Sequence, residues 1–265
     1  MNLASIAQLP EPKYGNPAIF RNNIERFKSR YPVLFYSFYD WGPGIIKLKG
    51  NPDQLRGSLF RDGSVNPFAV NNLVYLTGML IAQRHGLSHV IYLEEDCRVG
   101  CDYWDERIFE EYFNLGRPTI AAGTLACYNP CNCSPLAAKR WHELVASNTR
   151  RNFPVATYGW LPAAKQGASC VFPNGALGVY DVAWIDRLFP LNRSMELAAI
   201  TSAWDMQLGV KVWEMFGEES YDVLGFLDSI YSGFANNVTT EDERKAMLTR
   251  GDVVAVHQIK SPWQP

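Results

Sequence analysis

A chain of 265 residues, of which 47% are hydrophobic and 20% are charged, is long enough to bury one full globular core. Its formal net charge of -2 argues against the basic face that duplex nucleic acid usually requires. No apolar run approaches the roughly 20 residues that cross a membrane, and residues 1–14 lack the cationic start of a signal peptide. We therefore expect a cytoplasmic protein whose six cysteines are reduced thiols, with a zinc clasp or a disulfide as the alternatives.

The first predicted elements are a helix and a strand. Asn16 followed by Pro17 is a favourable helix start, and Pro32 ends this helix. Residues 33–38 are apolar and aromatic, and we predict that they form the first buried strand of an open α/β sheet.

The end of this strand and the loop after it are candidates for nucleotide binding. In an open α/β sheet, the loop after the first strand commonly contacts a nucleotide. The candidate residues here are Tyr36, Ser37, Tyr39 and Asp40. Tyr39 could stack on a base, and Asp40 could accept hydrogen bonds from a base or ribose. A β-turn in which Asp40 bonds to its own backbone is the alternative.

Residues 44–86 supply a second strand, a polar segment and a helix. The strand is predicted over 44–50, and a helix opens at Asn66 and ends near Gly86. Arg61, in the polar segment between them, is a candidate phosphate contact, although a surface loop explains that segment equally well. Neither strand is followed by a phosphate-binding loop or a G-x-G-x-x-G turn, which excludes both of those nucleotide sites.

The most informative stretch joins a buried strand, predicted over residues 90–93, to three consecutive carboxylates, Glu94, Glu95 and Asp96. Ligands of open α/β sheets bind at the carboxyl ends of the strands. Because side chains alternate along an extended chain, we expect Glu94 and Asp96 on one side and Glu95 on the other. Such oxygen donors suit Mn²⁺ or Mg²⁺, particularly a cation that also holds phosphates. An acidic loop or the first turn of a helix is the alternative.

The next predicted elements are a helix over 103–113, a strand over 118–127 and a helix over 135–147. A second candidate ligand loop follows at Asn174 and Gly175. The glycine would let the backbone approach a ligand closely, and the asparagine offers both a donor and an acceptor. A tight turn between two strands is the alternative.

The last candidates lie on a helix and at the end of a strand. After a short helix over 181–189, Asp205 opens a helix that runs to about residue 216, where it is either a capping-box carboxylate or an ionised general base. The last strand, predicted over 252–258, contains His257, which could bind a metal. Lys260 follows three residues later and could contact a phosphate. A structural role for a lone histidine is the alternative.

In this order, the pieces resemble the GT-A-fold glycosyltransferases, which use nucleotide sugars. The segment Glu94 to Asp96 is similar to the acidic D-x-D motif that holds Mn²⁺ or Mg²⁺ on the donor diphosphate. Residues 257–263 resemble the H-x-x-G-x-K-P-W element of glycogenin-like members, although the glycine is missing and the lysine does not precede the proline directly. Trp204 with Asp205 resembles the helix-borne acidic motif of the family.

The resemblance implies an αβα sandwich with a mostly parallel, Rossmann-like central sheet. It implies one domain over residues 1–265, with a nucleotide-binding half at about 16–127 and an acceptor-binding half at about 128–265. The expected metal ligands are Glu94, Asp96 and His257. The expected donor contacts also include Glu95 and Lys260, and Asp205 would act as the base if the enzyme inverts.

The implied reaction is metal-dependent transfer of a sugar, expected to come from a UDP-sugar, to the hydroxyl of a glycan or a small molecule. A modified base in DNA is a less favoured acceptor, because the chain is nearly neutral. One alternative is a nucleotidyltransferase acting on a sugar phosphate, but such enzymes usually carry a basic glycine-rich loop after the first strand. Another is a sugar-binding protein without catalysis, since aromatic residues make up 13% of the chain.

Overall fold

The strand β4 (His89–Leu93) lies at the centre of a seven-stranded sheet in the computed structural model. The structure describes residues 1–10, 17–59, 65–66, 68–116, 120–122, 125–127, 171–173, 177–200, 204–216, 224–227, 229–232 and 241–257. The order of the sheet is β10-β6-β9-β4-β1-β2-β3, with β1 at Leu3–Gln8, β2 at Val33–Ser37, β3 at Ile45–Lys47, β6 at Ile120–Ala122, β9 at Leu177–Asp181 and β10 at Leu224–Phe226. Neighbouring strands are parallel except at β9, which is antiparallel to both β4 and β6. The prediction of a mostly parallel sheet is confirmed.

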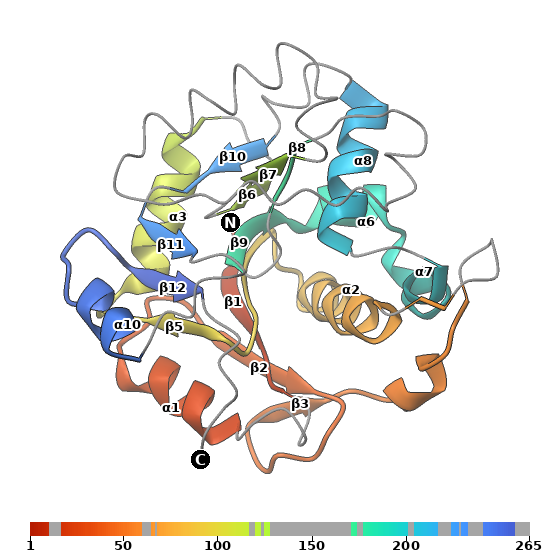
Figure 1. Cartoon of the computed structure of the whole chain (residues 1–265), viewed down its shortest axis with the longest axis horizontal. Coiled ribbons are helices and arrows are strands. Elements are labelled where there is room, and N and C mark those ends of the chain that lie inside the picture. The colour runs from red at the N-terminus through yellow and green to blue at the C-terminus, as the bar shows by residue number, and fades with distance from the viewer. Residues whose placement is uncertain are drawn as a thin grey trace.

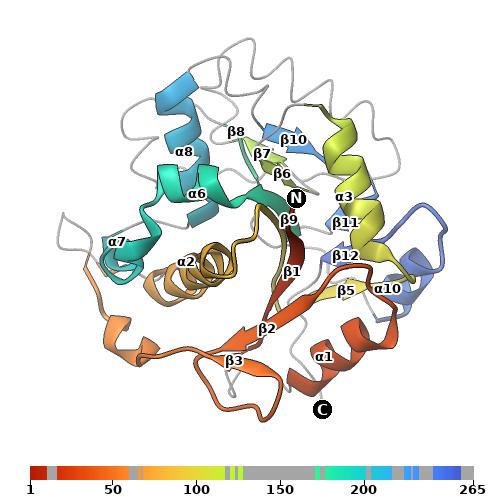
Figure 2. The ribbon, with the colours of Figure 1, turned by 180° about the vertical axis from the view of Figure 1, so that it is seen from behind.

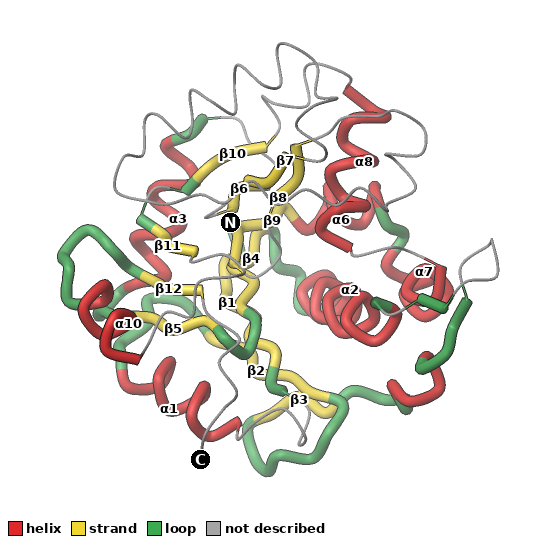
Figure 3. Tube along the Cα trace, viewed as in Figure 1, coloured by secondary structure: helices red, strands yellow, loops and turns green. Residues whose placement is uncertain are grey.

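Helices cover both faces of this sheet (Figures 1 and 2). One face packs against α2 (Ala69–Arg84), α6 (Val182–Leu188), α7 (Ser194–Ile200) and α8 (Trp204–Phe216). The other face packs against α1 (Pro17–Arg26), α3 (Trp104–Asn114) and a small sheet of β11 (Ile230–Ser232), β12 (Ala255–His257) and β5 (Cys97–Val99). The helix α10 (Glu241–Leu248) contacts β12, and β7 (Leu125–Cys127) pairs with β8 (Val171–Pro173). Figure 3 shows the same layers by secondary structure, and they confirm the predicted αβα sandwich.

The alternation of side chains along β4 explains why both faces of the sheet need a cover. Val90 and Tyr92 belong to the core beneath α2, whereas Ile91 and Leu93 belong to the core beneath α1 and α3. All four side chains are completely buried. A strand that is buried on both faces has a continuous apolar sequence, and this pattern identified β4 in the sequence.

The first strand of the sheet is β1, so the prediction that residues 33–38 form the first strand is wrong. β1 lies between β4 and β2, with Ser5 opposite both Ile91 and Val33. Residues 4–7 are completely buried, yet three of them are Ala or Ser. Such small residues lack the β-branched and aromatic side chains that mark most strands.

Most predicted helices are found close to where they were expected, at α1, α2, α3, α6 and α8. The strand predicted over 118–127 is instead two short strands, β6 and β7, which belong to different sheets. The helix predicted over 135–147 lies outside the described residues. The short elements β5, β10, β11, α7 and α10 have no counterpart among the predictions. Within the part of the chain that the structure describes, every helix is too short or too polar to span a bilayer.

Candidate active site

The carboxylates of Glu94, Glu95 and Asp96 lie in a tight turn between β4 and β5, which we call the acidic turn. The backbone N–H of Cys97 donates a hydrogen bond to the Glu94 carbonyl oxygen at 3.0 Å, which closes a four-residue β-turn. The three side chains are half-buried. Because the chain turns here, the two-residue alternation of an extended strand, on which the predicted grouping of Glu94 with Asp96 rests, does not apply.

A buried arginine holds the acidic turn from β5. Only 6% of Arg98 is exposed, and its Nη1 donates hydrogen bonds to the carbonyl oxygens of Glu95, at 3.1 Å, and Cys97, at 2.7 Å. Its guanidinium also lies over the ring of Phe20 in α1, 6.0 Å from the centroid. Hydrogen bonds from a charged donor are stronger than neutral ones, so Arg98 restrains the backbone that carries the carboxylates. Arg98 was not among the predicted site residues, although an arginine between two apolar residues of a short strand is a signal for such a role.

The end of β12 lies beside the acidic turn. β12 is antiparallel to β5, and the register places His257 opposite Cys97. The backbone of His257 is therefore next to the residue that follows Asp96. The fold thus brings together the two distant segments that contain the predicted metal ligands.

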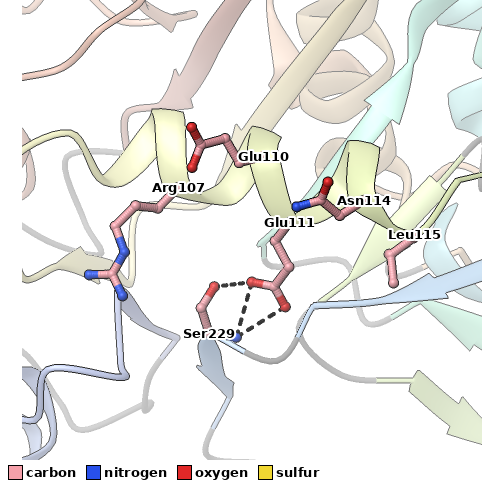
Figure 4. A pocket seen from close by; sticks show the side chains of 6 residues that line it. All are labelled: Arg107, Glu110, Glu111, Asn114, Leu115 and Ser229. Atoms are coloured by element: carbon pink, nitrogen blue, oxygen red, sulfur yellow. Dashed lines mark hydrogen bonds between the residues drawn. The ribbon is translucent and has the colours of Figure 1, made fainter.

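A pocket of about 380 Å³ lies between α3 and the residue that precedes β11 (Figure 4). Its lining residues are Arg107, Glu110, Glu111, Asn114, Leu115 and Ser229. The Glu111 carboxylate accepts hydrogen bonds from the Ser229 backbone N–H, at 3.2 Å, and from the Ser229 hydroxyl. The Ser229 carbonyl oxygen accepts a hydrogen bond from the Val254 N–H at 2.8 Å, just before β12. None of the lining residues is a predicted site residue, and the contacts of Glu111 support β11 and β12.

On the other face of the sheet, Asp205 lies in the first turn of α8, directly after Trp204. The Trp204 ring stacks on Tyr75 of α2, with centroids 3.4 Å apart and planes 7° apart. It also meets Tyr92 and Tyr180 edge to face, at 5.8 and 5.9 Å. These four rings join α8 to α2, β4 and β9, and such aromatic pairs each contribute about 0.5–1.5 kcal/mol beyond their burial.

The electrostatic surroundings of Tyr180 link the acidic turn to α8. Burial raises the pKa of Tyr180 well above its usual value, and the negative charges of Asp205 and Glu94 raise it further. Burial and two neighbouring tyrosines also raise the pKa of Tyr75, with a further contribution from Asp205. The negative charges of Asp205 and Glu94 therefore both oppose ionisation of the Tyr180 hydroxyl.

Two of the predicted nucleotide-binding residues on β2 are part of the core. Tyr36 is completely buried, and its hydroxyl donates a hydrogen bond to the Val74 carbonyl oxygen of α2 at 3.2 Å. Gly78 leaves room for this hydroxyl, because a Cβ atom at that position would overlap it. Ser37 is 2% exposed, and its hydroxyl accepts a hydrogen bond from the Tyr39 N–H at 3.1 Å. This burial does not fit direct contact of Tyr36 or Ser37 with a nucleotide.

The loop after β2 forms the turn that was the alternative to nucleotide binding, in which Asp40 bonds to the nearby backbone. The Asp40 Oδ1 atom accepts a hydrogen bond from the Gly42 N–H at 3.2 Å, and Oδ2 lies 3.4 Å from the Lys47 Nζ atom. The Gly42 N–H and then Lys47 lower the pKa of Asp40. Tyr39 is half-buried and packs against the core beneath α2. Since β2 is the second strand, the reason for placing a nucleotide at this loop is also lost.

The other predicted donor contacts lie outside the described residues. These are Arg61, Asn174, Gly175 and Lys260. The nearest described residue after the Asn174 loop is Leu177, which begins β9 opposite Leu93, the last residue of β4.

The oxygen atoms that the acidic turn offers are of the type that a hard divalent cation binds. Carboxylate oxygens are the ligands that Mg²⁺ and Mn²⁺ prefer, and imidazole is an accepted further ligand for transition metals. Among the side chains that the structure describes, no group of three or more His, Cys, Asp or Glu residues forms a complete metal centre. The side chain of His257 lies outside that set.

No protein-family model matches the chain, and no curated protein matches it either. Among solved structures, it is similar to mouse xyloside xylosyltransferase 1 in its apo form, with 10% identity over 99% of this chain and 100% of the other and a TM-score of 0.42. It is also similar to an active-site mutant of LgtC, with 13% identity over 97% and 88% of the two chains and a TM-score of 0.43. The mannosyltransferase Ktr4p from S. cerevisiae gives 9% identity over 87% and 68% and a TM-score of 0.41. These similarities are distant, so we base the function of this chain on its own residues.

Proposed function

We propose that this chain is a metal-dependent glycosyltransferase that moves a sugar from a nucleotide sugar to an acceptor hydroxyl. The observation that carries the proposal is the position of the acidic turn, which follows the carboxyl end of β4 and lies beside the end of β12 that contains His257. Asp205 lies in the first turn of α8, directly after Trp204, whose ring meets Tyr92 of β4 edge to face. This end of a parallel strand is where open α/β sheets bind their ligands.

Each carboxylate segment would have its own task. Asp96 and Glu94 would hold the divalent cation, with His257 as a further ligand, and the bound cation would neutralise charge on the leaving diphosphate. Lys260 would add a fixed positive charge beside the same phosphates. Asp205, in the first turn of α8, would accept the proton of the acceptor hydroxyl, since the positive end of a helix favours a negative charge there.

The substrates follow from the same proposal. The donor would be a UDP-sugar, and the acceptor would be a glycan or a small molecule. The net charge of -2 makes a modified base in DNA less suitable as an acceptor. The donor would bind the half of the chain at about residues 16–127, together with β1. The acceptor would bind the half at about residues 128–265. The remaining candidate donor contacts are Arg61, Glu95, Asn174 and Gly175.

A thermal-shift screen of nucleotide sugars tests the proposal, with Mn²⁺, Mg²⁺ or EDTA present in each case. A ligand that binds only the folded state stabilises it by about 2.7 kcal/mol at 100 times its Kd. We expect one nucleotide class to raise the Tm, and to do so only with a divalent cation. A lack of any shift across the screen would reject the proposal.

Product analysis then separates the remaining alternatives. Donor hydrolysis that depends on Mn²⁺ supports a glycosyltransferase, whereas binding without hydrolysis indicates a sugar-binding protein. Release of pyrophosphate from a nucleoside triphosphate and a sugar phosphate would indicate a nucleotidyltransferase instead.

A further inference from the structure

The start of α8 is held by a side chain of another helix. Asn72 of α2 is completely buried, and its Oδ1 accepts a hydrogen bond from the Trp204 N–H at 3.0 Å. Its Nδ2 donates to the carbonyl oxygen of Ala198 in α7 at 3.5 Å. One buried amide therefore bridges the end of α7 and the first residue of α8.

This contact does the work of a helix cap. The first N–H groups of an α-helix have no acceptor within the helix, and a side-chain oxygen that accepts one of them stabilises the helix start. The usual cap comes from the residue before the helix, but Asn72 lies 132 residues from Trp204 in the chain. Three residues after Asn72, Tyr75 stacks on the Trp204 ring. The backbone and the ring of Trp204 are thus both held by α2.

We propose that Asn72 is a positioning residue for Asp205. By holding Trp204, it sets the place and direction of the first turn of α8, and with them the carboxylate of Asp205. The inference rests on the proposed function, in which Asp205 accepts the proton of the acceptor hydroxyl. Misplacing a reacting group by about 1 Å can cost on the order of 100-fold in rate, so a cap of this kind has a measurable effect.

Asn66 provides a matched control on the same side of the sheet. It is 3% exposed, its Nδ2 donates to the carbonyl oxygen of Ala199 in α7 at 2.9 Å, and its Oδ1 accepts from the Phe68 N–H at 3.0 Å. Its Nδ2 also lies 3.5 Å from the carbonyl oxygen of Ala198, in α7 as well. Asn66 is therefore a buried amide bonded to α7, whereas the Trp204 N–H donates to Asn72.

The test compares Asn72→Leu with Asn66→Leu, since leucine keeps a branched side chain and removes both hydrogen-bonding atoms. We expect Asn72→Leu to lower the kcat of sugar transfer about 10- to 100-fold with an unchanged KM for the donor. Asn66→Leu should lower the Tm to a similar degree and leave kcat within about 2-fold. In an Asp205→Asn background, Asn72→Leu should lower kcat no further, because residues that act as a unit are not additive.

Equal losses of kcat in the two leucine variants would overturn the proposal, as would a further loss in the Asp205→Asn background. If Asn72→Leu does not fold, Asn72→Ser takes its place, because serine is too short to bridge the two helices. If the wild-type protein transfers no sugar at all, the proposed function fails separately. Hydrogen exchange then tests whether Asn72 holds the start of α8. Faster exchange in the first turn of α8 in Asn72→Leu than in Asn66→Leu supports it, and equal exchange overturns it.

Discussion

The two carboxylate segments of the candidate site are held in place by different means. The acidic turn is held by its immediate neighbours, because Cys97 closes the turn and Arg98 binds its carbonyl oxygens. Asp205 is held from a distance, through the contacts of Asn72 and Tyr75 with the residue before it. The acidic turn therefore needs little more than β4 and β5, whereas the position of Asp205 depends on the packing of α2, α7 and α8.

The largest expected effect tests the acidic turn. Asp96→Asn keeps the size of the side chain but removes the charge of a proposed cation ligand. We expect metal-dependent donor hydrolysis to fall about 1,000-fold, which corresponds to roughly 4 kcal/mol. Initial rates over a series of Mn²⁺ concentrations measure the loss. Asp242→Asn, on the exposed side of α10, is the charge-matched control, and full activity of the Asp96 variant would refute the metal assignment.

Arg98→Met tests the local support of the acidic turn. The change leaves the carbonyl oxygens of Glu95 and Cys97 without their charged donor, and we expect a loss of about 3 kcal/mol in the free energy of unfolding. Urea denaturation measures the loss, and hydrogen exchange should rise in β5 but not in α8. Arg250→Met, at an exposed ion pair with Asp252, should cost less than about 1 kcal/mol. Equal losses in the free energy of unfolding for Arg98→Met and Arg250→Met would contradict a supporting role of Arg98 at the acidic turn.

Trp204→Leu tests the distant support of Asp205. It removes the stack on Tyr75, and we expect a loss of about 2 kcal/mol in the free energy of unfolding. Hydrogen exchange should rise in α8 but not in β5, which is the reverse of the pattern expected for Arg98→Met. The control is Trp184→Leu in α6, where the half-buried ring packs with Arg187. A rise in both segments would mean that the two supports are not independent.

The smallest expected effect is at a tyrosine hydroxyl. The Tyr75 hydroxyl is buried and has no hydrogen-bond partner among the described residues. Tyr75→Phe keeps the stack on Trp204, and it should leave the free energy of unfolding unchanged or raise it by up to about 1 kcal/mol. Tyr36→Phe should instead cost about 1 kcal/mol, because its hydroxyl bonds to the Val74 carbonyl oxygen. A larger loss for Tyr75→Phe would reveal a partner for its hydroxyl.

The sequence predicted the elements whose side chains follow a clear period. The continuous apolar run of β4 and the helical spacing of α1 and α2 reflect their burial, so these elements could be found without a structure. β1 was missed because Ala4, Ser5 and Ala7 fill a crowded centre with small side chains, which carry little strand signal.

The site was harder to predict than the fold. Glu94 to Asp96 could be identified as a ligand site because three carboxylates follow a buried strand. The arrangement of their side chains could not be predicted, since these three residues are compatible with both a turn and an extended chain. The support of Asp205 by Asn72 joins residues 132 positions apart, and no local pattern encodes such a contact. Asp40 shows the opposite case, because its contact with Gly42 is local and was foreseen as an alternative.

The reversed strand β9 has a consequence for how the chain folds. The strands β1, β2, β3 and β4 all come from the first 93 residues and form one parallel half of the sheet. β9 joins that half only by pairing with β4 across a long stretch of chain, and β6 and β10 depend on β9. Contacts between distant segments form late, since closing long loops costs entropy. Pulsed hydrogen exchange during refolding should therefore protect β1 and β2 before β10, and simultaneous protection would rule out this order of assembly.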